Sequence, residues 1–105
     1  MKNIFISLGL SLLFLNVYAQ DVKAGRDKAD AACALCHGVN GIATMPSAPN
    51  LAGQPPIYVS EQLKHYRNGK RQHEVMGVIA KPLTDADIAN LAAWYSSIKF
   101  TVEAP

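Results

Sequence analysis

The chain has 105 residues and a mass of 11.3 kDa, which is enough for one small domain. Half of the residues are hydrophobic and 17% are charged, a balance that excludes an intrinsically disordered, collagen-like or low-complexity chain. The net charge of +2 argues against a nucleic-acid-binding protein, because such proteins usually carry a dense excess of basic residues.

Residues 1–19 have the three-part pattern of a secretory signal peptide. Lys2 places a positive charge before an apolar run over residues 4–15, and Val17 and Ala19 occupy the −3 and −1 positions of a cleavage site. The run is shorter than the roughly 20 residues that a membrane-spanning helix needs, so an uncleaved anchor is the less favoured interpretation. We therefore expect cleavage after Ala19 and an exported domain over residues 20–105, without stable membrane insertion.

The exported domain is small, and its two cysteines are too close together to stabilise it as a disulfide. A domain of this size usually needs a disulfide, a metal or a cofactor to complete its core. A bridge between Cys33 and Cys36 would close a tiny loop and hardly constrain the unfolded chain. The next residue is His37, and the resulting C-x-x-C-H string is the attachment motif of c-type haem.

The spacing of this motif has a physical reason. The alanine-rich composition of residues 22–36 predicts a first helix, and positions i, i+3 and i+4 of a helix share one face. The thiols of Cys33 and Cys36 can then form thioethers with the two vinyl groups of a haem, and the His37 imidazole becomes an axial iron ligand. The large apolar cofactor would also supply the missing interior.

Two other chemistries fit the cysteines less well. A thioredoxin-like redox pair belongs beside a βαβ pattern, and this chain has no strand-rich segments. A zinc site needs four ligands, which Cys33 and Cys36 would have to share with two of His37, His65 and His73. The sequence contains no second C-x-x-C and no H-x-x-x-H, so haem is the favoured cofactor.

The rest of the chain alternates helices with turn-rich connections. Residues 37–54 are rich in glycine and proline and predict a loop. Pro55 and Pro56 open a second helix that Gly69 closes, and residues 69–83 form another connection. Thr84 caps a final helix that carries acidic residues in its first turn. The predicted fold is all-α, with about three main helices.

Several short segments of the chain, in their order along the sequence, resemble those of class I c-type cytochromes. The resemblance is to the short bacterial monohaem type, which is similar to one half of the dihaem bacterial cytochromes. It covers essentially all of residues 20–105 and implies a cytochrome c-like fold around one covalently attached haem c. The main matching segments are Cys33-Ala34-Leu35-Cys36-His37-Gly38, Pro49-Asn50-Leu51-Ala52-Gly53-Gln54, Leu83-Thr84-Asp85-Ala86-Asp87-Ile88 and Leu91-Ala92-Ala93-Trp94-Tyr95.

The resemblance implies a role for individual residues. Cys33 and Cys36 match the thioether cysteines, and His37 matches the proximal axial ligand of the iron. Pro49 matches the proline whose carbonyl accepts the Nδ1–H of that histidine, a bond that fixes the ring and raises its basicity as a ligand.

Two further correspondences concern the helix contacts and the basic residues. Gly25 and the Trp94-Tyr95 pair match a contact between the first and last helices, and residues 69–71 fall where the family often has a basic residue near the haem propionates. Lys64, Arg67 and the basic residues of 69–71 form a cluster at one helix end. This cluster would steer an acidic partner, lie near the propionates, or be a solvated helix end.

The sixth iron ligand decides which functions are open. Met76 lies in the connection before the last helix, which can cross to the distal face, so it is the predicted second axial ligand. Met45 follows His37 closely and is expected to pass the proximal side, where it would fill a gap in the core. His73 is the alternative distal ligand.

Ligation by His37 and Met76 would leave no open iron coordination site, which suits electron transfer. The sequence therefore predicts a periplasmic one-electron carrier, not an enzyme, that acts with redox partner proteins of unknown identity. The main alternative is a haem c subunit of a larger periplasmic oxidoreductase. A haem sensor or peroxidase-like protein with an open distal site is less favoured.

Overall fold

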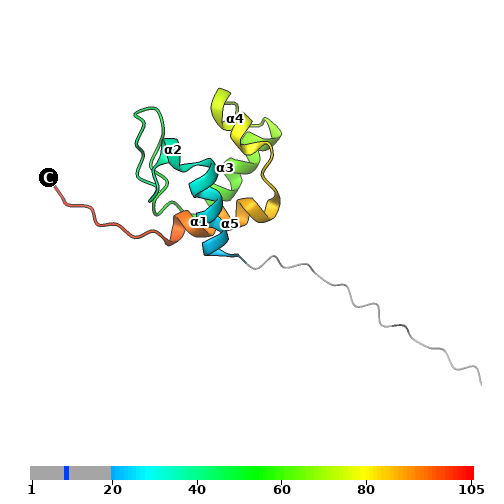
Figure 1. Cartoon of the computed structure of the whole chain (residues 1–105), viewed down its shortest axis with the longest axis horizontal. Coiled ribbons are helices and arrows are strands. Elements are labelled where there is room, and N and C mark those ends of the chain that lie inside the picture. Colours follow the sequence, from blue (N-terminus) through cyan, green and yellow to red (C-terminus); the bar gives the residue numbers. More distant parts are fainter. Residues whose placement is uncertain (1–8, 10–19) are drawn as a thin grey trace, which may run out of the picture.

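The computed structural model describes Gly9 and residues 20–105, so the predicted signal segment lies outside the described residues apart from Gly9. Within the described part the chain is helical and contains no strand, which confirms the all-α prediction. Three longer helices, α1 (Val22–Ala32), α3 (Pro56–Asn68) and α5 (Asp85–Ser97), are accompanied by the short α2 (Ala34–His37) and α4 (Glu74–Ala80) (Figure 1). None of the helices in this part has the length and apolar character that crossing a membrane requires.

The first predicted helix is interrupted at Cys33. α1 begins after Asp21, whose side chain accepts a hydrogen bond from the Ala24 N–H, and it ends at Ala32. Cys33 has φ −122° and ψ −30°, outside the helical values, although its N–H still donates to the Ala29 carbonyl at 2.8 Å. The prediction of one helix over residues 22–36 was therefore wrong in this detail, because a new turn, α2, starts after the first cysteine.

α1 and α5 cross in close contact (Figure 1), and Gly25 makes this approach possible. A Cβ atom on Gly25 would lie 1.9 Å from the Asn90 carbonyl oxygen and 3.0 Å from the Trp94 Cβ. The Asp21 N–H also donates to the Asn90 side chain at 2.9 Å. The predicted contact between Gly25 and the last helix is confirmed.

The buried core lies where α5 meets the other helices. It is formed by small and aliphatic side chains together with one tyrosine: Ala29, Ala80, Leu83, Ile88, Leu91 and Tyr95. Since α5 supplies three of these residues, it is the central element of the fold.

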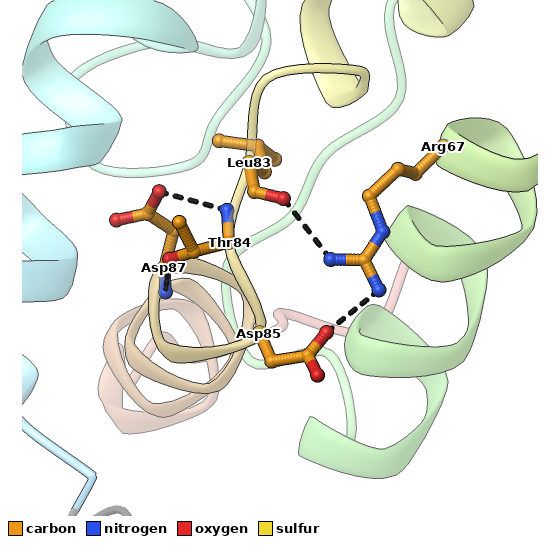
Figure 2. A network of polar contacts seen from close by, with 5 residues as sticks. All are labelled: Arg67, Leu83, Thr84, Asp85 and Asp87. Atoms are coloured by element: carbon orange, nitrogen blue, oxygen red, sulfur yellow. Dashed lines mark hydrogen bonds and ion pairs between the residues drawn. The ribbon is translucent and has the colours of Figure 1, made fainter.

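A polar network ties the end of α3 to the start of α5 (Figure 2). The Arg67 guanidinium donates to the Leu83 carbonyl at 3.0 Å and to the Asp85 carboxylate at 2.6 Å. Thr84 and Asp87 form a capping box, with each side chain accepting from the other residue's N–H at 3.0 Å. Arg67, a member of the predicted basic cluster, therefore has a structural role in joining α3 to α5.

This network also makes the stability of the fold depend on pH. The hydrogen bond and charge of Arg67 lower the pKa of Asp85, and the hydrogen bond from the Thr84 N–H lowers the pKa of Asp87. A carboxyl group whose pKa falls on folding adds stability above its unfolded pKa, and that stability is lost as the pH falls through the folded pKa.

α4 lies in a segment that was predicted to be a connection, residues 69–83. The helix begins after His73, whose Nδ1 accepts hydrogen bonds from the N–H groups of Val75 and Met76, both at 3.2 Å. Histidine is not among the residues that usually mark a helix N-terminus. The sequence pattern therefore gave no start signal for α4, and the prediction of a plain connection was wrong.

The close contact at Gly25 predicts an unusual sign for Gly25→Ala. Helix propensity alone would favour alanine in α1 by about 1 kcal/mol. Because the new Cβ would meet backbone atoms of α5, we expect instead that the free energy of unfolding falls by about 1–3 kcal/mol, measured by denaturant titration. The exposed Ala31→Gly variant is the control and should lose only about 1 kcal/mol of propensity. A more stable Gly25→Ala protein would show that the helices are not in close contact.

Candidate functional site

The helices enclose a cavity of about 550 Å³ whose walls come mainly from apolar side chains. Residues of all five described helices and of the loop 38–54 contribute to these walls. The five site residues that the sequence predicted all line this one cavity: Cys33, Cys36, His37, Pro49 and Met76. The tyrosines Tyr58 and Tyr66 line it as well, whereas His65 does not.

The two cysteines are half-buried free thiols. Cys33 is the N-cap residue of α2, and Cys36 lies within this helix. The N–H groups of Cys36 and His37 both donate to the Cys33 carbonyl, at 3.3 and 3.0 Å, which closes the turn that carries the motif. Burial raises the pKa of the Cys33 thiol, and this effect is partly opposed by the Tyr95 hydroxyl and the charge of Lys28. The Cys33 sulfur is thus held as a neutral thiol on the cavity wall.

The tautomer of His37 follows from its hydrogen bond. The imidazole is only 7% exposed, and its Nδ1 lies 2.8 Å from the Pro49 carbonyl oxygen. A carbonyl oxygen can only accept, so Nδ1 carries the proton and donates. The lone pair of the neutral ring is then on Nε2, the nitrogen that is free to bind a metal.

The loop 38–54 is folded so that Pro49 faces His37. Gly38 and Gly41 have φ values of +79° and +72°, which side-chain-bearing residues rarely adopt. The N–H groups of Leu51 and Ala52 donate to the Gly41 carbonyl at 2.7 and 3.0 Å, which turns the loop back on itself. The Ala43 N–H also donates to the Asn50 side chain at 2.7 Å, so backbone and side-chain hydrogen bonds together hold the segment that presents the Pro49 carbonyl.

The two methionines reach the cavity from different elements. The Met45 N–H donates to the Cys36 carbonyl at 3.3 Å, which ties this residue to the segment that carries His37. Met76 is supplied by α4, which packs against α3. Of the two sulfur atoms, that of Met76 is thus carried by an element independent of the His37 turn.

His73, the alternative distal ligand, also lines the cavity, but it already has a structural role. Both N–H groups that its Nδ1 accepts from belong to the first turn of α4, so His73 fixes the helix that carries Met76. Its imidazole packs edge-on against the Tyr66 ring, with the ring centroids 6.3 Å apart.

Polar side chains gather on one part of the cavity wall, and we call Gln62, Tyr66, Arg71 and His73 the polar cluster. The Arg71 guanidinium donates to the Gln62 side-chain oxygen at 2.9 Å and lies over the Tyr66 ring, 4.7 Å from its centroid. All four residues line the cavity. The sequence pointed to Arg71 through its charge, whereas it assigned no role to Gln62.

The arrangement has the donors for haem rather than for a bare metal ion. Among the described residues, no group of three or more His, Cys, Asp and Glu side chains is placed to hold a metal ion, whereas a structural zinc site needs four ligands. An apolar cavity with two thiols one turn apart and one oriented imidazole fits a flat, apolar, covalently bound iron porphyrin. The fold and the site thus have the features of small helical proteins that carry covalently bound haem.

Comparison with known proteins agrees with this class. The profile of the family described as Cytochrome c matches residues 22–99. The chain belongs to the cytochrome c family, whose members transfer electrons through covalently bound haem c.

Individual relatives differ in length. A cytochrome c-554(548) from Halomonas halodenitrificans is 43% identical over 82 residues, which cover 75% of this chain and 98% of that protein. A thiosulfate dehydrogenase electron acceptor from Thiomonas intermedia is 42% identical over 71 residues, which cover 66% of this chain and 32% of that protein. The crystal structure of reduced recombinant cytochrome c4 from Pseudomonas stutzeri has a TM-score of 0.72 and 36% identity, covering 80% of this chain and 48% of that one.

Other curated relatives are cytochromes c4, and this chain spans between 40% and 53% of their length. The chain thus resembles one half of these longer proteins, as its sequence predicts.

The capping role of His73 predicts different effects for two substitutions. His73→Ala removes the acceptor at the start of α4, and the free energy of unfolding should fall by about 1 kcal/mol. His73→Asn keeps a side-chain acceptor at that position and should lose much less. Denaturant titration of both variants against the wild-type chain provides the measurement. Equal losses in the two variants would mean that the imidazole ring, rather than its Nδ1 acceptor, stabilises the segment.

Proposed function

We propose that this protein is a one-electron carrier whose cavity holds one covalently attached haem c. The observation that supports this most strongly is that Cys33, Cys36, His37 and Met76 line the same apolar cavity. When bound, the haem supplies a couple between ferric and ferrous iron. Residues 20–105 form the working domain in this proposal.

The two thiols attach the cofactor. Each cysteine would add its sulfur and hydrogen across one vinyl group, so that the thioether forms without net oxidation or reduction. Because Cys33 and Cys36 are joined by the turn that ends at His37, a haem attached at these sulfurs would have the imidazole available as a ligand. The Pro49 carbonyl keeps the ring in one orientation and leaves Nε2 as the ligand atom.

Met76 is the proposed distal ligand. It is supplied by α4, whereas Met45 is tied by its backbone to the same turn as the proximal histidine. The cap that His73 provides holds the start of α4 in place. Because Nδ1 of His73 accepts these bonds, the proton of the neutral ring lies on Nε2, which leaves that nitrogen without a lone pair for a metal. A thioether sulfur opposite an imidazole is the ligand pair that raises the potential of cytochromes c.

The polar cluster is the proposed contact for the haem propionates. Arg71 supplies a cation with several N–H donors, and Gln62 already shares one of them. The remaining cavity wall is largely apolar and would keep water from the iron. With both axial positions filled, the chain's own residues bind, orient and shield the cofactor and take no part in bond-making with a substrate.

The location follows from the same proposal. Residues 1–19 have the pattern of a signal peptide, which supports a location outside the cytoplasm. We therefore place the working protein in the periplasm, where donor and acceptor proteins would meet the haem edge.

The test is an optical spectrum of the exported protein, made in cells with haem-attachment machinery, for the wild type and for Met76→Ala. The wild type should give a low-spin c-type spectrum with the weak far-red band of a methionine–iron bond. Met76→Ala should lose this band, because alanine has no donor atom for the vacated coordination position.

Met45→Ala is the matched control, because it removes the other methionine of the same cavity and should keep the band. Loss of the band in Met45→Ala instead would contradict the assignment of Met76. A covalent haem without the band in the wild type, with rapid binding of carbon monoxide, would favour a sensor or peroxidase-like protein with an open distal site.

A second candidate function is that of a haem c subunit in a larger periplasmic oxidoreductase. It is favoured by the similarity to a thiosulfate dehydrogenase electron acceptor, of which this chain spans 32%. In that role the chemistry on a substrate would take place on the partner, and this chain would only receive the electrons.

The two candidates predict different behaviour during purification from the native cells. A free carrier should elute at the size of its own chain, with or without moderate salt. A subunit should elute with a larger protein at a fixed ratio and carry electrons from the substrate of that protein. Elution at monomer size without such a partner would contradict the subunit role.

A further inference from the structure

Tyr95 is one of the most deeply buried residues of the cavity wall. It is 2% exposed and belongs to the central helix α5. Its carbonyl accepts the Gly53 N–H at 2.9 Å, and a Cβ atom on Gly41 would lie 3.1 Å from its ring atom Cδ1. The ring therefore has contacts from α5 and from the loop 38–54, which leave it little freedom to turn.

The hydroxyl of this fixed side chain is buried and has no hydrogen-bond partner among the described residues. Buried hydroxyl groups in folded proteins are nearly always hydrogen-bonded, so an unpaired one requires an explanation. Tyr95 lines the cavity that the haem is proposed to fill. The explanation we consider is that the Tyr95 hydroxyl acquires a hydrogen-bond acceptor only when the cofactor is attached.

Cys33 lies on the same cavity wall and packs against the buried core cluster that contains Tyr95. Burial raises the pKa of Cys33 and Tyr95 acts against this rise, whereas burial, followed by Cys33, raises the pKa of Tyr95. Asp30 also acts on the hydroxyl, through its charge alone, and Lys28 acts on the thiol.

Haem attachment changes what the Cys33 sulfur can do. A free thiol has a weak S–H donor of its own, so it does not depend on the hydroxyl for a hydrogen bond. A thioether has lost that hydrogen and can only accept. After attachment the Tyr95 O–H is therefore the sole donor of the pair.

We propose that Tyr95 is a positioning residue whose hydroxyl donates to the thioether sulfur of Cys33 and thereby helps to set the reduction potential. This inference rests on the proposed function. The hydrogen bond would hold the first attachment point in place. It would also direct the positive end of the O–H dipole toward the edge of the haem, which favours the ferrous state because that state carries one positive charge less.

The test compares Tyr95→Phe with the wild type as full haem-loaded proteins. Phenylalanine keeps the packed ring and removes only the hydroxyl, so covalent attachment and the methionine–iron band should persist. At a fixed applied potential, the ferrous-to-ferric ratio should fall about threefold, which for one electron corresponds to a midpoint lowered by about 28 mV.

Ser96→Ala is the matched control, because it removes a hydroxyl from the next residue of α5, where it already donates to the Ala93 carbonyl. Its midpoint should equal that of the wild type. An unchanged midpoint in Tyr95→Phe, or an equal shift in Ser96→Ala, would overturn the proposal.

A vibrational measurement decides the matter even if Tyr95→Phe fails to fold. The carbon–sulfur stretching band of the wild-type haem protein should shift between H₂O and D₂O, because the hydroxyl proton exchanges. A band that does not respond, in a protein with covalent haem, would overturn this inference alone. Absence of covalent haem would overturn the proposed function and the inference with it.

Discussion

The close approach of α1 and α5 at Gly25 is the constraint on which the rest of the site depends. With only a hydrogen in place of a side chain, Gly25 lets the Asn90 carbonyl come to a distance that any Cβ would forbid. The crossing brings the end of α1, and therefore Cys33, against the core cluster that contains Tyr95, a residue of the last turn of α5. The motif turn continues from that fixed point to His37, so the geometry of the proposed haem site begins with a helix contact outside it.

Two further devices complete the cavity wall around that crossing. The loop 38–54 uses glycines with positive φ to bring the Pro49 carbonyl to His37, which fixes the proton on Nδ1. The His73 cap holds α4, which carries Met76. One device orients the proposed proximal ligand and the other holds the helix of the proposed distal one, and each uses hydrogen bonds between a histidine side chain and the backbone.

Local sequence patterns predicted the parts of this structure that depend on near neighbours. The spacing of Cys33, Cys36 and His37 and the Thr84 cap follow from one helical turn, and both lie where expected. The pairing of His37 with Pro49 and of Gly25 with α5 came only from the resemblance, because these contacts join distant segments.

Other features had no readable signal in the sequence. α4 begins at a histidine cap, a residue type that rarely starts helices, and its hydrogen bonds depend on the folded loop. The break at Cys33 and the unpaired hydroxyl of Tyr95 likewise depend on how α1, α2 and α5 pack together. Such features are consequences of tertiary contact, which composition and periodicity do not contain.

The most direct test of the central claim is the intact mass of the exported protein under denaturing conditions. A covalently attached cofactor stays with the chain when the fold is lost, whereas a haem held only by its axial ligands is released. The account predicts the mass of residues 20–105 plus that of one haem. A mass equal to that of the polypeptide alone, from cells able to attach haem, would contradict it.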